Sequence, residues 1–200
     1  MTFAIFLALA YLLGAVPFGL LVAKSRGIDI RKKGSGNIGA TNVFRCVGKG
    51  WGLFTFALDA LKGFIPAFVF PRIAGLDPDY GVWLGLIAII GHSFPVYLKF
   101  KGGKGVATSA GMLLGVAPLA VGIGFLCWLL CMVLSRYVSL SSVVAAIAVA
   151  ATTWIQDRGL VINIALTALA LMVVWLHRAN IKRLLAGTES RFERKKEAQA

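Results

Sequence analysis

The chain has 200 residues, of which 58% are hydrophobic, and its 21 Lys and Arg residues outnumber 8 Asp and Glu residues. An ordinary soluble domain is about 45–50% apolar, so the excess excludes that class and predicts a membrane protein with basic patches between apolar stretches. The basic clusters lie beside apolar runs and no nucleic-acid-binding module is recognisable, which favours membrane lipid and phosphorylated metabolites over nucleic acid as partners.

Five long apolar runs predict membrane-spanning helices, since a span needs about 20 residues. The first run has basic residues after it and none before it, which is not typical of a cleaved signal peptide. In chain order the runs are 2–23, 51–70, 80–98, 138–155 and 160–176.

The stretch 106–134 allows either one long helix or two short passes, because it contains several glycines and Pro118. With two passes, every Lys and Arg except Lys62, Arg72 and Arg158 falls on one side of the membrane. The positive-inside rule therefore favours an all-α polytopic protein with about seven spans, its N-terminus outside and its C-terminus in the cytoplasm. We expect one membrane-embedded domain over 1–192 and a polar cytoplasmic tail over 193–200.

The first cytoplasmic loop reads KGSGNIGATNVFR over 33–45 and contains G-x-G-x-x-G at 34–39. A dinucleotide site would need a preceding strand and a βαβ unit, whereas this loop follows a membrane helix. Small residues let backbone N–H groups approach an anion, polar side chains add hydrogen bonds, and an arginine can clamp phosphate. A flexible surface loop remains the alternative. The candidate site residues are Gly34, Ser35, Gly36, Asn37, Gly39, Thr41, Asn42 and Arg45.

The second cytoplasmic loop reads KFKGGKGVAT over 99–108. It is not a Walker A motif, because the lysine at position 104 is followed by glycine. Free N–H groups, the dipole of the following helix and a lysine favour an anion at this point, although basic residues here can also be simple topology anchors. The candidates are Gly102, Gly103, Lys104 and Gly105.

Other polar residues lie in or near the spans. Asp59 and Lys62 are spaced to pair on one helix face inside the second span, either as a structural ion pair or as support for a site. His92 is expected to be structural or supporting. Ser142 lies at a helix start, where serine often caps, and is also a candidate for substrate binding; His177 and Asn180 follow the last span on the side of both loops.

Six sequence fragments, in order, resemble the PlsY family of bacterial acyl-phosphate:glycerol-3-phosphate acyltransferases. They are GSGNIGATNVFR, LDALKG, GHSFPVY, FKGGKGVAT, RYVSLSS and HRANIKRLLAG, and they cover nearly the whole chain. The resemblance implies that Ser35 and Arg45 are the essential serine and arginine of the family. It also implies that 102–105 form its phosphate loop, and that His177, Asn180 and Glu189 belong to its third motif.

The resemblance further implies an enzyme of the bacterial inner membrane, active at the cytoplasmic face, that converts acyl phosphate and glycerol 3-phosphate into lysophosphatidic acid and phosphate. Such a reaction needs no metal and no cofactor, because the donor is already activated. A functional link to the soluble phosphate acyltransferase that makes acyl phosphate is expected. The competing class is a transporter for phosphorylated metabolites, which would predict an inverted repeat and midplane charges; a membrane enzyme that uses another phosphorylated acceptor is a second alternative.

Overall fold

The computed structural model describes residues 1–192, and every regular element among them is helical. Two compact units are distinguished, Met1–Val121 and Gly122–Ala200, with the boundary in the first turn of one helix. The expected all-α membrane fold is confirmed, while the predicted tail, 193–200, lies outside the described residues.

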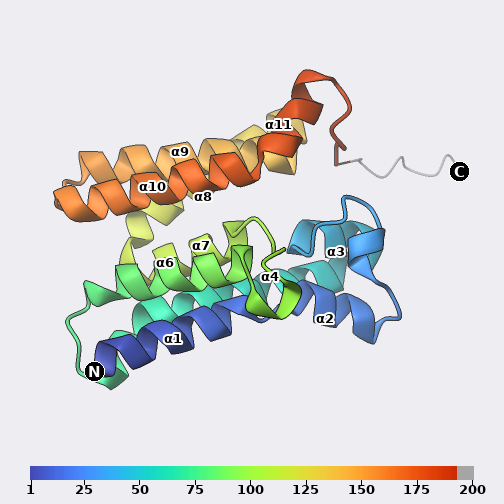
Figure 1. Cartoon of the computed structure of the whole chain (residues 1–200). Coiled ribbons are helices and arrows are strands. Elements are labelled where there is room, and N and C mark those ends of the chain that lie inside the picture. Colours follow the sequence, from blue (N-terminus) through green and yellow to red (C-terminus); the bar gives the residue numbers. More distant parts are fainter. Residues whose placement is uncertain (193–200) are drawn as a thin grey trace, which may run out of the picture. The chain divides into compact units, whose positions relative to one another are not determined.

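The first unit contains ten helical elements, several of them broken pieces of longer apolar segments, and Figure 1 shows the course of the chain through them. In chain order they are α1 (Thr2–Ala15), α2 (Phe18–Ser25), η1 (Ile30–Lys32), α3 (Ala40–Cys46), α4 (Lys49–Phe64), η2 (Ile65–Val69), α5 (Phe70–Ala74), α6 (Tyr80–Ser93), η3 (Val96–Leu98) and α7 (Val106–Val116).

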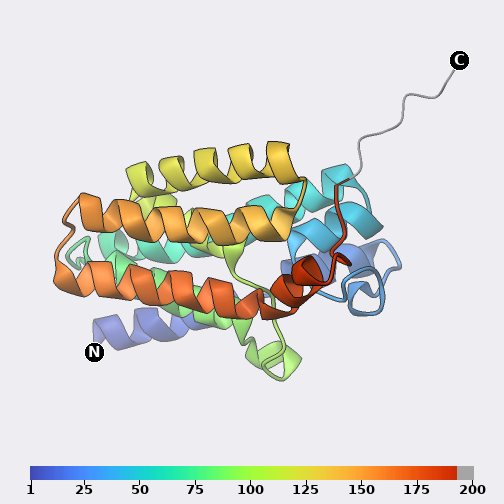
Figure 2. The same cartoon turned by 90° about the horizontal axis from the view of Figure 1, so that it is seen from above.

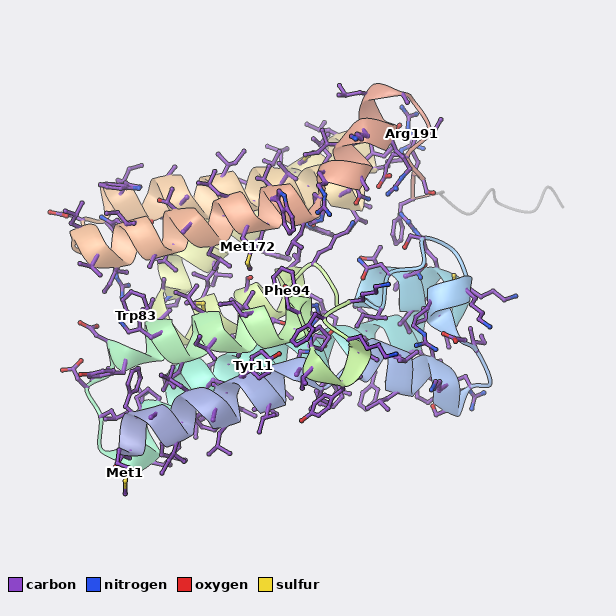
Figure 3. The ribbon with its side chains drawn as sticks, viewed as in Figure 1. Met1, Tyr11, Trp83, Phe94, Met172 and Arg191 are labelled. Atoms are coloured by element: carbon purple, nitrogen blue, oxygen red, sulfur yellow. The ribbon has the colours of Figure 1, made fainter. Side chains whose placement is uncertain are left out.

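Glycines allow the helices of this unit to pack backbone to backbone. A Cβ atom at Gly14 of α1 would overlap the Ala88 backbone of α6, and one at Gly111 of α7 would overlap the Ala60 backbone of α4. Small residues at such crossings are typical of membrane helices, which associate by close contact. Tyr11 of α1 also donates from its hydroxyl to the Phe94 carbonyl at 2.8 Å, beyond the end of α6 (Figure 3).

The second unit contains α8 (Pro118–Ser135), α9 (Val138–Ile155), α10 (Leu160–Leu176) and α11 (Arg178–Leu185). The helices α8, α9 and α10 lie side by side in both views (Figure 2). The chain bends by 54° between α10 and α11. After α11 it folds back, so that the Phe192 N–H donates to the Arg136 carbonyl at 2.9 Å.

Within residues 1–192, five helical segments are long and apolar enough to cross a membrane, or six if α10 and α11 form one bent span. The expected break inside 106–134 lies at Ala117, between α7 and α8. At 11 residues, α7 is about 16 Å long, roughly half the thickness of the hydrocarbon core. The seven-span count and the orientation of the termini remain predictions.

Candidate active site

The buried side chain of Asn42 holds the first glycine-rich loop together. Its Oδ1 accepts from the Ser35 N–H at 3.1 Å. Its Nδ2 lies within hydrogen-bond distance of the carbonyl oxygens of Ile30 (3.2 Å), Lys33 (3.0 Å) and Asn37 (2.9 Å). Only 2% of Asn42 is exposed. Asn42 was predicted to bind phosphate. In the structure its side chain makes its hydrogen bonds to the backbone of the loop.

Most N–H groups of this loop are engaged by acceptors of the loop itself. The Gly36 N–H donates to the Lys33 carbonyl at 3.0 Å, the Asn37 N–H to Ser35 Oγ at 3.4 Å, and the Gly39 N–H to Asn37 Oδ1 at 3.2 Å. These groups were expected to face an anion. Instead the loop is closed on itself and leaves Ser35 exposed at its surface.

The helix α3 begins at Ala40 and places Thr41 and Arg45 one turn apart, as the sequence predicts. Thr41 is half-buried and Arg45 is exposed in the last turn. The exposed serine and the exposed guanidinium are therefore presented by the two ends of one short segment that Asn42 braces.

The second loop is bound to the end of α6. The Gly102 N–H donates to the Ser93 carbonyl and the Gly103 N–H to the His92 carbonyl, each at 3.1 Å. Lys104 is half-buried between two buried glycines. Gly105 has a φ of +76°, a left-handed conformation that favours glycine, and directly precedes α7.

A charged group lies buried beside this loop. Lys62 Nζ is 2.8 Å from Asp59 Oδ1, and each residue is only 2% exposed, which confirms the predicted ion pair. His92, with 5% exposed, places its Nδ1 3.6 Å from the same carboxylate oxygen. Lys62 also donates to the Val16 carbonyl at 2.8 Å, at the break between α1 and α2.

In the second unit, His177 lies at the bend between α10 and α11 and is 3% exposed. Its Nδ1 is 2.8 Å from the Val173 carbonyl oxygen. A carbonyl can only accept, so Nδ1 carries the hydrogen and Nε2 is the basic nitrogen of the neutral ring.

Asn180 and Glu189 belong to one hydrogen-bonded cluster. Glu189 Oε1 accepts from Asn180 Nδ2 at 2.6 Å and from Ser139 Oγ at 2.7 Å, and Oε2 accepts from Arg183 Nε at 2.7 Å. Burial alone would raise the pKa of Glu189, but these hydrogen bonds and the Arg183 charge together hold it below its ordinary value.

Sequence reasoning singled out neither Arg183 nor Ser139 as a functional residue. The arginine–glutamate spacing in the last motif was the available signal for Arg183, whereas Ser139 is 50 positions from Glu189. Ser142, predicted as a substrate ligand, donates its hydroxyl to the Val138 carbonyl at 2.8 Å, and Trp128 Nε1 lies 3.4 Å from the same Oγ. Within residues 1–192, no group of three His, Cys, Asp or Glu side chains is arranged to hold a metal ion.

The predicted residues thus fall into two constellations. The first unit carries both glycine loops with the buried ion pair, and the second carries His177, Asn180 and Glu189.

Comparison with known proteins gives one consistent family. The family model described as glycerol-3-phosphate acyltransferase matches residues 4–187. A glycerol-3-phosphate acyltransferase of Aquifex aeolicus is 44% identical over 192 residues, covering 94% of this chain and 99% of the relative. One of Macrococcus caseolyticus is 46% identical over 197 residues, covering 98% and 100%.

Two solved structures are also similar. Both are crystal structures of PlsY, an integral membrane glycerol 3-phosphate acyltransferase, at 40% identity and with 96% of each chain covered. The glycerol 3-phosphate form has a TM-score of 0.91 and the lysophosphatidic acid form 0.89.

Proposed function

The chain belongs to the glycerol-3-phosphate acyltransferase family of integral membrane proteins, and we propose that it transfers a fatty acyl group from acyl phosphate to the 1-hydroxyl of sn-glycerol 3-phosphate. The hydroxyl oxygen forms a bond to the acyl carbon, the bond from that carbon to the phosphate oxygen breaks, and the hydroxyl loses its proton. The products are lysophosphatidic acid and inorganic phosphate.

The full-length family match carries the proposal, and the chemistry of the loops supports it. Both substrates are phosphorylated, and each glycine loop of the first unit carries a cationic side chain, Arg45 or Lys104. The similar PlsY structures were obtained in glycerol 3-phosphate and lysophosphatidic acid forms, which are the acceptor and the product proposed here.

Catalysis would come from positioning and from stabilisation of charge. Arg45 and Lys104 hold phosphate groups, and Ser35, exposed on a loop that Asn42 braces, contacts substrate or the developing oxyanion. A covalent acyl-serine is not required, because the donor is a mixed anhydride. In the first loop the side chains carry this role, because the N–H groups of Ser35, Gly36, Asn37 and Gly39 are already bonded.

The proton of the hydroxyl has two acceptors that fit the chemistry. His177 Nε2 is basic when Nδ1 donates to Val173. A phosphate oxygen of the substrate is the other. Asn180, fixed by Glu189 at 2.6 Å, is assigned to substrate positioning beside His177.

The protein acts, in this proposal, in the bacterial inner membrane with its site on the cytoplasmic face. Its basic loops and basic last helix fit that orientation. The soluble phosphate acyltransferase that produces acyl phosphate is the functional partner.

The test uses purified protein in detergent or lipid with palmitoyl phosphate and labelled glycerol 3-phosphate. Acyl-CoA and acyl carrier protein serve as rival donors, and Lys104→Ala as the site variant. We expect lysophosphatidic acid from acyl phosphate alone, with loss of product in the variant. If acyl-CoA gives product at an equal rate, acyl phosphate is not the specific donor. If folded protein gives no product with any donor, the acyltransferase proposal is rejected.

A further inference from the structure

The second glycine loop is built around His92. The carbonyl of this residue accepts the Gly103 N–H, and its imidazole faces the same glycine. A Cβ at Gly103 would overlap Nε2 and lie 2.8 Å from Cε1, so the ring itself limits position 103 to glycine. A Cβ at Gly102 would instead overlap the His92 carbonyl oxygen and lie 2.5 Å from Pro95 Cδ and 2.6 Å from the Ser93 oxygen, and none of these atoms belongs to the imidazole.

The opposite edge of the ring faces the buried ion pair. Nδ1 lies 3.6 Å from Asp59 Oδ1, which is beyond hydrogen-bond distance. It has no hydrogen-bond partner among the described residues. The imidazole is therefore held between a carboxylate of α4 and the backbone of the loop.

A gain in protein stability does not by itself explain why Asp59, Lys62 and His92 are buried together. Burying charged residues inside a span is costly, and a buried pair is often no more stable than an apolar replacement. Lys62 and Asp59 nevertheless converge with His92 where the α1–α2 break, α4 and the end of α6 meet. What this group adds is a fixed place for the ring against which the loop rests.

We propose that His92, oriented by Asp59 and Lys62, is a positioning residue that sets the Gly102–Gly105 loop for binding the phosphate of glycerol 3-phosphate. His92 acts through the loop backbone and touches no substrate. The assignment rests on the proposed function, because the loop needs a phosphorylated substrate.

The kinetic test compares His92→Leu with His92→Asn. The leucine fills the space without a polar atom, whereas the asparagine amide keeps a donor for Asp59. We expect His92→Leu to raise KM for glycerol 3-phosphate about tenfold, the scale of one lost buried polar contact, with little change in kcat. His92→Asn should recover most of that loss. Asn163→Leu, a buried polar-to-apolar change in α10 of the second unit, is the matched control and should leave KM unchanged.

A second test uses the geometry of the two glycines. Gly103→Ala meets the imidazole, so adding it to His92→Ala should not weaken glycerol 3-phosphate binding further. Gly102→Ala meets two backbone oxygens and the Pro95 ring rather than the imidazole, so adding it to His92→Ala should weaken binding further. The proposal is overturned if, in folded protein, Gly102→Ala and Gly103→Ala weaken glycerol 3-phosphate binding by the same factor when each is added to His92→Ala. A wild-type KM in His92→Leu would also overturn it. Wild-type protein that forms no lysophosphatidic acid would instead reject the proposed function.

Discussion

Replacing Asn42 tests whether the first glycine loop is held from within. Asn42→Ala removes the acceptor of the Ser35 N–H and the amide that faces three carbonyl oxygens. A buried polar group left without a partner costs about 1–3 kcal/mol. Lys33 and Asn37 are exposed or half-buried, so their carbonyls can bind water, whereas Ile30 is 0% exposed; we therefore count the Ile30 carbonyl as one such loss. If this free-energy cost distorts the loop and weakens transition-state binding, kcat/KM decreases about 5- to 150-fold.

Asn42→Asp sharpens the prediction, because it keeps an acceptor for Ser35 but places a second oxygen against the carbonyls. We expect it to be at least as impaired as Asn42→Ala, with a higher KM for both phosphorylated substrates. Cys46→Ala, one turn along α3, is the control, since its thiol makes only a 3.6 Å contact with Asn42. Initial rates and amide exchange at Ser35 are the measurements. Folded Asn42→Ala with wild-type kcat/KM and unchanged Ser35 exchange would refute the reasoning.

Three further predictions concern Gly34 of the first loop and His177 and Glu189 of the second unit. Gly34→Ala should abolish most activity, because φ is +58° and a Cβ would overlap Asn42 and lie 2.7 Å from Cys46 Sγ. Gly27→Ala, with φ +72° and open space, should retain activity in the same assay. His177→Gln should lower kcat about 10²- to 10⁴-fold and remove the acidic limb of the pH–rate profile if Nε2 takes the proton; an unchanged limb would assign the proton to substrate phosphate. Glu189→Gln should destabilise the protein by about 1–2 kcal/mol at pH 7, because hydrogen bonds to a charged group are lost. This energy already includes a reduction for solvent screening of the partly exposed Arg183. The Glu189 pKa is lowered on folding, so its contribution is complete above the ordinary glutamate pKa of about 4.3 and is lost as pH falls through the folded value. Thermal midpoints of the two proteins should therefore converge in acid, and a constant difference would contradict this assignment.

The apolar spans were predictable because their signal is local. The runs predicted at 138–155 and 160–176 coincide with α9 (Val138–Ile155) and α10 (Leu160–Leu176). The Asp59–Lys62 pair was predictable for the same reason, since both residues lie on one helix. The break at Pro17, which divides the predicted first span into α1 and α2, could have been read from the missing N–H of proline.

What sequence could not supply is the partner of each polar atom. Ser139 and Glu189 are 50 positions apart, and Lys62 and the Val16 carbonyl are 46 apart. Nothing local records such pairs, because tertiary packing brings them together. The same limit affected the first glycine loop, where the letters G-x-G-x-x-G do not reveal that Asn42 and Asn37 already accept two of the N–H groups.

The two loops are fixed in different ways, and in each of them several backbone N–H groups are already bonded within the protein. The first loop is braced from within by Asn42, and the second is bound to carbonyls at the end of α6. Backbone donors bonded in this way are unavailable to a ligand, but they cost no reorganisation when substrate arrives. In the proposed function, Arg45 and Lys104 supply the full charges that recognise phosphate. The glycines of the two loops then serve close packing and backbone conformation.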